Sequence, residues 1–139
     1  MTALAGKVAV VTGASRGLGR ATAVAFAEAG ADVALAARSK PDLAETAHQI
    51  QAAGRRALVV PTDVTSYAEV EVLMTRAREE LGRLDIVVNN SGVARVKPLI
   101  EWTPEEWRAL VDVNLLGVLN GCRAAAPYLI AQRAGKVIN

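Results

Sequence analysis

Residues 12–19 read Thr-Gly-Ala-Ser-Arg-Gly-Leu-Gly, and this stretch decides how the rest of the sequence is interpreted. It follows a β-rich apolar run at residues 7–12 and precedes an Ala-rich segment with helical periodicity at residues 20–29. A glycine-rich turn between a first strand and a first helix lets backbone N–H groups approach a pyrophosphate, and the helix adds the positive end of its dipole. The alternative is a structural turn whose glycines only supply positive φ angles. Three glycines in one such turn favour a cofactor site.

The glycines follow the pattern G-x-x-x-G-x-G, which differs from the common dinucleotide pattern G-x-G-x-x-G. No Lys-Ser/Thr pair follows the last glycine, as a P-loop requires. The residues of this stretch expected to bind the cofactor are Thr12, Gly13, Ser15, Arg16, Gly17, Leu18 and Gly19.

Strand-like and helix-like segments alternate along the whole chain. Strands are predicted at residues 7–12, 32–37, 56–62, 84–88 and 136–139, and helices at residues 20–29, 41–53, 66–81 and about 104–131. Capping boxes are expected to open the last two helices, and the final helix to bend near residues 117–121 and at Pro127. Such βαβ units predict a doubly wound α/β domain over residues 1–139, with a parallel sheet in the strand order 3-2-1-4-5.

Composition excludes several classes of protein. The 139 residues are 52% hydrophobic and 22% charged, as in one globular domain. The net charge is only +2 and no basic run accompanies it, so a nucleic-acid partner is not expected. One cysteine and one histidine argue against a disulfide framework and a metal site. No signal sequence and no apolar run near the ~20 residues of a membrane span is found, so a cytoplasmic protein is expected.

The last predicted strand begins at Lys136 and continues to the end of the sequence. A strand in this place leaves an apolar sheet edge without a covering helix. We therefore expect the chain to be the N-terminal part of a longer fold, truncated after the fifth strand.

The residues after the second strand indicate which nicotinamide cofactor is bound. NAD sites place a carboxylate about 20 residues after the glycines, where it holds the ribose 2′-OH. This sequence has Ala36-Ala37-Arg38-Ser39 at that place, with no acid. Arg38 is placed to meet a 2′-phosphate, and Arg16 offers a second guanidinium. The alternative is two solvated surface arginines. The prediction is NADP(H), with NAD the weaker candidate.

Four motifs together resemble the short-chain dehydrogenase/reductase family. They are the Thr-Gly-x-x-x-Gly-x-Gly stretch, Asp63-Val64 after the third strand, Asn89-Asn90-Ser91-Gly92 after the fourth, and Asn114 in the long helix. The third is similar to the Asn-Asn-Ala-Gly motif of the family, with Ser91 in place of Ala. The resemblance covers Gly6 to Asn139 and looks most like the 3-oxoacyl-carrier-protein reductase type. It implies a Rossmann-like fold and hydride transfer between a nicotinamide and a carbonyl or alcohol substrate.

The resemblance also implies roles for these residues. Asp63–Val64 would line the adenine pocket, and Asn90–Gly92 would lie against the ribose and the nicotinamide. Asn114 would hold a water in a proton relay, on a helix face that it shares with apolar side chains. Each has a plainer reading: an Asp that ends a strand, Asn residues that form a turn, and an Asn that bonds to nearby backbone.

The catalytic Ser, Tyr and Lys that the family uses are not found in this sequence. Tyr67 and Tyr128 are followed at the fourth position by Glu71 and Gln132, not by Lys. The chain by itself is therefore expected to be inactive. Three hypotheses stay open: the N-terminal part of an NADP-dependent reductase that is a homo-oligomer at full length, a non-catalytic dinucleotide-binding remnant, and a binding protein without cofactor.

Overall fold

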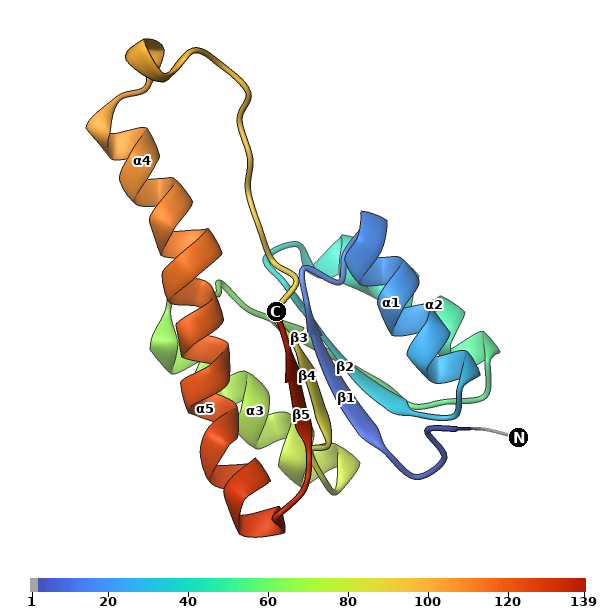
Figure 1. Ribbon diagram of the computed structural model, residues 1–139. Coiled ribbons are helices and arrows are strands. Elements are labelled where there is room, and N and C mark those ends of the chain that lie inside the picture. Colours follow the sequence, from blue (N-terminus) through green and yellow to red (C-terminus); the bar gives the residue numbers. More distant parts are fainter. Residues whose placement is uncertain (1–2) are drawn as a thin grey trace.

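The computed structural model describes residues 3–139, along which strands alternate with helices (Figure 1). The strands are β1 (Val8–Thr12), β2 (Asp32–Ala37), β3 (Ala57–Pro61), β4 (Ile86–Val88) and β5 (Lys136–Ile138). The α-helices are α1 (Gly17–Glu28), α2 (Lys40–Ala52), α3 (Tyr67–Leu81), α4 (Pro104–Val111) and α5 (Gly117–Gln132). A 3₁₀ turn, η1 (Leu99–Glu101), precedes α4, and a π-helical turn, η2 (Asp112–Leu116), joins α4 to α5. The predicted alternation is confirmed.

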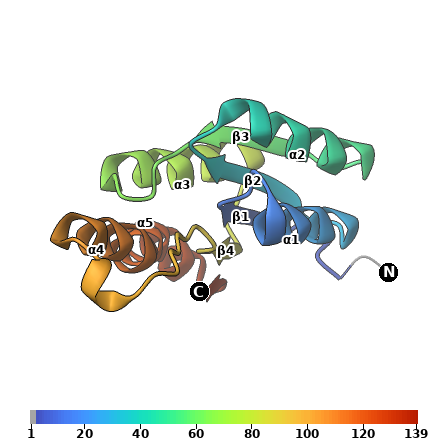
Figure 2. The same ribbon diagram turned by 90° about the horizontal axis from the view of Figure 1, so that it is seen from above.

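The five strands form one parallel sheet in the order β3-β2-β1-β4-β5, as predicted. The helices α1 and α2 cover one face of the sheet, and α3 and α5 cover the other (Figure 2). Each face has its own apolar core: Leu43 and Ile50 of α2 lie in one, and Leu73 and Met74 of α3 lie in the other. The architecture is the doubly wound α/β arrangement.

The central strands are buried because helices cover both of their faces. All of β1, and β2 as far as Ala36, lie in the interior. Strands buried on both sides read as continuous apolar runs, which is why the sequence pattern locates them so well. Their carboxyl ends lie side by side, so the loops that follow β1, β2, β3 and β4 meet at one edge of the sheet.

Several element ends differ from the prediction. The helix α1 begins at Gly17 rather than Arg20, because the last glycines of the turn already form its first turn. The Thr103–Glu106 capping box is complete. The Ser66 box is only half formed: the Ser66 hydroxyl accepts the Glu69 N–H, but the Glu69 carboxylate accepts the Asp63 N–H at 2.7 Å instead. That bond ties the loop after β3 to α3.

The long helix is interrupted, as predicted, but the interruption is the π-helical turn η2 just before Gly117, while Pro127 stays inside α5. Among residues 3–139, this helix from Pro104 to Gln132 is the one that length and composition alone would allow to cross a membrane. In this fold its Ala124 and Ala125 pack into the sheet core, as expected of a covering helix.

Apolar side chains lie open on two of the elements that flank or form the sheet. One is the α4–η2–α5 helix, where Trp107, Val111 and Leu115 are exposed. The other is β5 at the sheet edge, where Val137 and Ile138 are 38% and 46% exposed. The exposed edge at β5 agrees with the prediction. Trp107 and Val111, which share the helix face of Asn114, are exposed among residues 3–139.

Candidate cofactor-binding site

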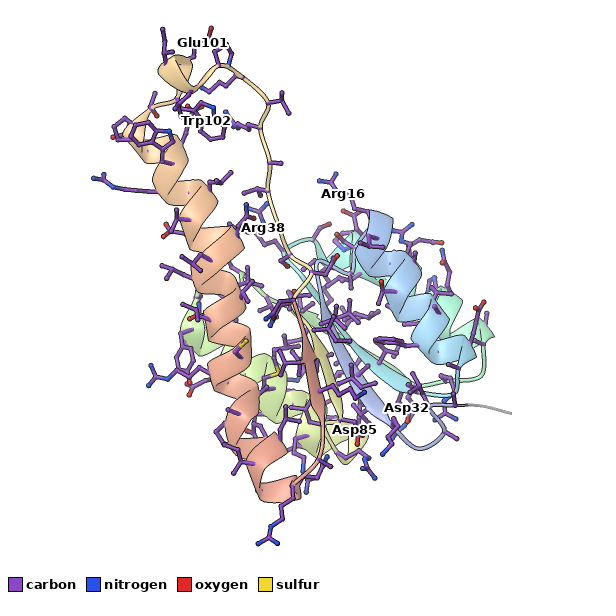
Figure 3. The ribbon with its side chains drawn as sticks, in the orientation of Figure 1. Arg16, Asp32, Arg38, Asp85, Glu101 and Trp102 are labelled. Carbon is purple, nitrogen blue, oxygen red and sulfur yellow. The ribbon has the colours of Figure 1, made fainter. Side chains whose placement is uncertain are left out.

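The loops at the carboxyl edge of the sheet bring most of the predicted site residues together. The glycine turn follows β1, Arg38 follows β2, Asp63–Val64 follows β3, and Asn89–Gly92 follows β4. Figure 3 shows Arg16 and Arg38 at this end of the molecule and Asp32 and Asp85 at the opposite end. Ligands in open α/β sheets bind outside the carboxyl ends of the strands, so this edge is the candidate site.

Two glycines of the turn have left-handed backbone conformations, with φ +65° at Gly13 and +55° at Gly17. A Cβ on Gly13 would lie 2.8 Å from the Asn90 amide nitrogen, and a Cβ on Gly19 would collide with the Gly13 carbonyl. Of these two glycines, Gly13 alone combines positive φ with close contact, because nothing lies within 4 Å of a Cβ on Gly17. The turn therefore packs directly on the loop after β4.

The side chains of Thr12 and Asn90 lock these two loops together. The Thr12 hydroxyl oxygen accepts the backbone N–H groups of Asn90 and Ser91, each at 3.0 Å. The Asn90 side-chain amide donates to the carbonyl oxygens of Thr12 at 3.0 Å and Gly13 at 3.4 Å. Both side chains are thus used to hold the backbone. In this arrangement the loops offer their backbone, rather than these side chains, to a ligand.

The first turn of α1 has no internal partner for its amide groups. The N-terminal N–H groups of an α-helix lack intrahelical acceptors, and here they belong to Gly17, Leu18 and Gly19. The N-cap residue Arg16 provides no side-chain bond, and the first turn contains no acidic residue. By contrast, α3 and α4 are capped by Ser66 and Thr103. The start of α1 can therefore receive an anion.

Two arginines flank this turn. Arg16 and Arg38 are exposed, and neither makes an ion pair within residues 3–139. The end of β2 carries Ala36 and Ala37, so this strand itself supplies no carboxylate there. Both guanidinium groups are therefore free to meet an anionic ligand.

Asp63 forms the turn that leads from β3 to α3. Its Oδ1 accepts the Thr65 backbone N–H at 2.9 Å and the Thr65 hydroxyl at 2.7 Å. These hydrogen bonds, with a smaller contribution from the Arg38 charge, hold the pKa of Asp63 below its usual value. The carboxylate thus stays ionised and keeps its second oxygen as an acceptor.

Val64 is held by the long helix, through two contacts that the sequence pattern did not reveal. The Asn120 amide donates to the Val64 carbonyl at 2.8 Å, and a Cβ on Gly117 would lie 2.8 Å from Val64 Cγ2. One turn further along, Gly121 lies directly against the Asn89 side chain. Gly117 and Gly121, in the region predicted to bend, thus let this helix approach the loops after β3 and β4.

Asn114 lies in the π-helical turn and holds the loop after β4. Its Oδ1 accepts the Val93 N–H and its Nδ2 donates to the Val93 carbonyl, both at 2.8 Å. A Cβ on Gly92 would lie 3.3 Å from the same Oδ1. Asn114 is exposed, not buried, and it bonds to backbone 21 residues away rather than to its own helix.

A glycine turn that opens onto an uncapped helix at the carboxyl end of the first parallel strand is the arrangement found in dinucleotide-binding α/β proteins. The sequence profile described as short chain dehydrogenase matches residues 7–139. The chain therefore belongs to the short-chain dehydrogenase family.

Relatives and solved structures agree with this family. An uncharacterised oxidoreductase of Staphylococcus aureus is 42% identical over 139 residues, which make up 100% of this chain and 59% of the relative. A crystal structure of a short-chain type dehydrogenase/reductase from Mycobacterium marinum superposes with a TM-score of 0.93 at 38% identity, covering 96% of this chain and 55% of that one.

A metagenomic short-chain oxidoreductase, solved in complex with NADP, superposes with a TM-score of 0.92 at 40% identity. The match covers 99% of this chain and 62% of that one. The chain thus spans a little over half the length of the proteins that it resembles. None of these three is named as a 3-oxoacyl-carrier-protein reductase, and that subtype stays a prediction.

Proposed function

We propose that these 139 residues are the dinucleotide-binding part of an NADP(H)-dependent oxidoreductase. The observation that carries the proposal is the uncapped start of α1 beside two arginines that have no carboxylate partner within residues 3–139. An uncapped helix start attracts a phosphate, and guanidinium groups bind phosphate oxygens in pairs. The NADP complex of a 40% identical relative supports the same choice of cofactor.

The residues fit this cofactor part by part. The N–H groups of residues 15–19 would hold the pyrophosphate, and Arg16 with Arg38 would hold the 2′-phosphate. Asp63–Val64 would flank the adenine, and Asn90–Gly92 would lie along the nicotinamide riboside. When bound, the nicotinamide would exchange a hydride with a carbonyl or alcohol carbon. Ser91 makes its bond through backbone N–H, so the change from Ala leaves this loop intact.

We propose that Asn114 supports a proton relay from its place in the π-helical turn. An Asn side chain has two N–H donors and two acceptor lone pairs, and Val93 uses one of each. The remaining N–H and lone pair are enough to hold a water, and the side chain is exposed to solvent. Since π-helical turns occur often at functional sites, the local backbone agrees with this role.

Neither tyrosine of this chain is suited to act as the acid or base. The Tyr128 hydroxyl shares a hydrogen bond of 2.9 Å with Thr75, and the Tyr67 ring lies under the Arg123 guanidinium. Tyr128 also lies 14 residues beyond Asn114, which is roughly 20 Å along a helix that rises about 1.5 Å per residue. The 139-residue chain would therefore bind the cofactor without turning over a substrate.

The full-length protein would act on a small carbonyl or alcohol compound in the cytoplasm, as a homo-oligomer. A non-catalytic dinucleotide-binding protein is the second candidate. Residues 1–139 contain no Tyr with Lys at the fourth following position, which both candidates predict. Both candidates predict cofactor binding by residues 1–139 and differ only in whether a Ser and a Tyr-x-x-x-Lys motif complete the site.

An activity assay and the coding sequence test the proposal. The purified chain is mixed with NADPH and a panel of ketones, aldehydes and 3-oxoacyl thioesters, and NADPH loss is followed by absorbance. We expect NADPH to bind without being consumed. Turnover that survives repurification and disappears in Gly13→Asp would mean that an acid/base group has been overlooked. The coding sequence beyond residue 139 separates the two candidates, because an in-frame Ser and Tyr-x-x-x-Lys define the enzyme and a stop codon defines the binding protein.

A further inference from the structure

Two side chains outside the predicted site hold the glycine turn from behind. Thr46, on α2, is fully buried, and its hydroxyl donates to the Ala14 carbonyl at 2.8 Å. Arg20, on α1, donates through Nε to the Thr46 hydroxyl at 3.0 Å. Its Nη2 also donates to the Ser15 carbonyl at 2.5 Å. The two carbonyls in the middle of the turn are thus held by donors from two different helices.

These bonds form a chain with a fixed direction. A guanidinium can only donate and a carbonyl can only accept, so the Thr46 hydroxyl must accept from Arg20 and donate to Ala14. Consecutive bonds of this kind polarise and strengthen one another. The Thr46 hydroxyl proton is therefore committed to the turn, although Thr46 lies 32 residues away from Ala14 in the sequence.

Holding the carbonyls also sets the direction of the amides. The peptide unit is planar and trans, so the C=O of one residue is antiparallel to the N–H of the next. The bond from Thr46 to Ala14 thus fixes the N–H of Ser15. In the same way, the bond from Arg20 to Ser15 fixes the N–H of Arg16.

The flanking carbonyls of the turn are also occupied. The Asn90 amide donates to Gly13, and the Arg20 backbone N–H donates to Arg16 at 3.3 Å. All four carbonyls from Gly13 to Arg16 therefore have a donor inside the protein. No carbonyl of the turn is left free to repel an anion.

We infer that Thr46 and Arg20 are positioning residues of the cofactor site, which aim the N–H groups of Ser15 and Arg16 at the pyrophosphate of the dinucleotide. This inference rests on the proposed function and adds α2 to the machinery of the site. It concerns the pyrophosphate, which NADP and NAD share, and not the 2′-phosphate. The two residues consequently affect both cofactors to the same degree.

A matched pair of substitutions tests the inference. Thr46→Val keeps the shape of the side chain and removes its hydroxyl, whereas Thr46→Ser keeps the hydroxyl. Kd values for NADPH and NADH are measured by fluorescence titration of the 139-residue chain, below the unfolding temperature of each variant. We expect Thr46→Val to raise both Kd values by about tenfold, the effect of one lost hydrogen bond to a charged group. Thr46→Ser should stay within twofold of the wild-type chain.

A second substitution covers the case in which Thr46→Val does not fold. Arg20→Met keeps the packing of a half-buried stem and removes the guanidinium. It should raise both Kd values by the same factor, in contrast to Arg38→Gln, which should raise only that of NADPH. Wild-type affinity in folded Thr46→Val or Arg20→Met, or an equal loss in Thr46→Val and Thr46→Ser, would overturn the inference.

Hydrogen exchange separates this inference from the proposed function, because it needs no cofactor. Amide exchange in the segment 13–19 should be faster in Thr46→Val than in Thr46→Ser and the wild-type chain. Unchanged exchange there would contradict the positioning role. Absence of any NADPH or NADH binding by the wild-type chain, with faster exchange in Thr46→Val, would contradict the proposed function alone.

Discussion

The two ends of the same parallel strands carry opposite arrangements of charge. At the amino edge, the buried Asp32 pairs with Arg55 and Arg56, both at 2.7 Å. The buried Asp85 there pairs with Arg83 at 2.6 Å and with Lys7 at 3.5 Å.

At the carboxyl edge, Arg16 and Arg38 have no carboxylate partner among residues 3–139, and the first turn of α1 is uncapped (Figure 3). The amino edge satisfies its charges internally and stabilises the fold. The carboxyl edge leaves these positive groups available to the proposed ligand. Substitutions at one edge should therefore affect stability, and substitutions at the other should affect binding.

The largest effect is expected from a methyl group in the glycine turn. Gly13→Ala places a Cβ at positive φ and 2.8 Å from the Asn90 amide, so the two loops must separate. We expect NADPH affinity to fall by about a hundredfold or more, since overpacking costs roughly 1–3 kcal/mol and left-handed strain adds to it. Gly54→Ala is the matched control: its φ of +73° gives similar strain, but nothing lies within 4 Å of the added Cβ. Equal Kd values for the two variants would contradict the proposed role of the turn.

The second effect concerns stability at the amino edge. Asp85→Asn removes a charge that accepts bonds from Arg83 and from the Val8 N–H. We expect a loss of about 2 kcal/mol in the free energy of unfolding, with the cofactor Kd unchanged. Urea denaturation and fluorescence titration measure the two quantities. A tenfold change in Kd would show that the two edges are not independent.

The same carboxylate predicts how stability depends on pH. Burial alone would raise the pKa of Asp85, but hydrogen bonds from Arg83 and Val8, with the Arg83 and Lys7 charges, hold it below the ordinary value of 3.8. A lowered folded-state pKa gives stability that is present above pH 3.8 and is lost as the pH falls through the folded-state value. Denaturation at a series of pH values should show this acid loss, and Asp85→Asn should make it shallower. An unchanged slope would show that Asp85 does not cause it.

The third effect concerns the choice of cofactor at the carboxyl edge. Arg38→Gln should raise the Kd for NADPH by roughly 30- to 150-fold, because it removes a charge-assisted bond worth about 2–3 kcal/mol. The Kd for NADH should stay unchanged. Arg133→Gln is the control, because it removes the same charge from an exposed residue at the far end of α5. If both variants weakened NADPH binding equally, the net positive charge of the protein rather than a phosphate site would explain the effect.

The smallest effect is expected from the residue that departs from the family motif. Ser91 contributes its backbone N–H to Thr12, so Ser91→Ala should leave the Kd for NADPH within twofold. Thr12→Val removes the acceptor of two backbone N–H groups and should weaken binding more than Ser91→Ala does. A larger loss in Ser91→Ala than in Thr12→Val would mean that the Ser91 hydroxyl itself contacts the cofactor.

The sequence predicts those parts of the molecule that depend on local pattern. Buried parallel strands are continuous apolar runs, so this pattern locates the strands and the loops at their carboxyl ends. The order of the strands in the sheet follows from the βαβ connections. The glycine turn and Arg38 are recognisable because their spacing from β1 and β2 is fixed by the βαβ unit.

Contacts between distant segments are not visible in such a pattern. Thr46 bonds to Ala14 across 32 residues, and Asn120 bonds to Val64 across 56. In the sequence, Thr46 and Asn120 look like ordinary helix residues, because neither has a hydrogen-bonding partner at helical spacing. The exposure of Asn114 is not visible in the pattern either, because an apolar face predicts burial only where another element covers it.

The most direct test of the account is a parallel titration of the 139-residue chain with NADPH and NADH under identical salt conditions. Fluorescence of the bound nicotinamide reports both affinities in one experiment. The account predicts that NADPH binds at least about tenfold more tightly, because the unpaired arginines meet its 2′-phosphate. Equal affinities, or tighter binding of NADH, would contradict the claim that the carboxyl edge is built for a 2′-phosphorylated dinucleotide.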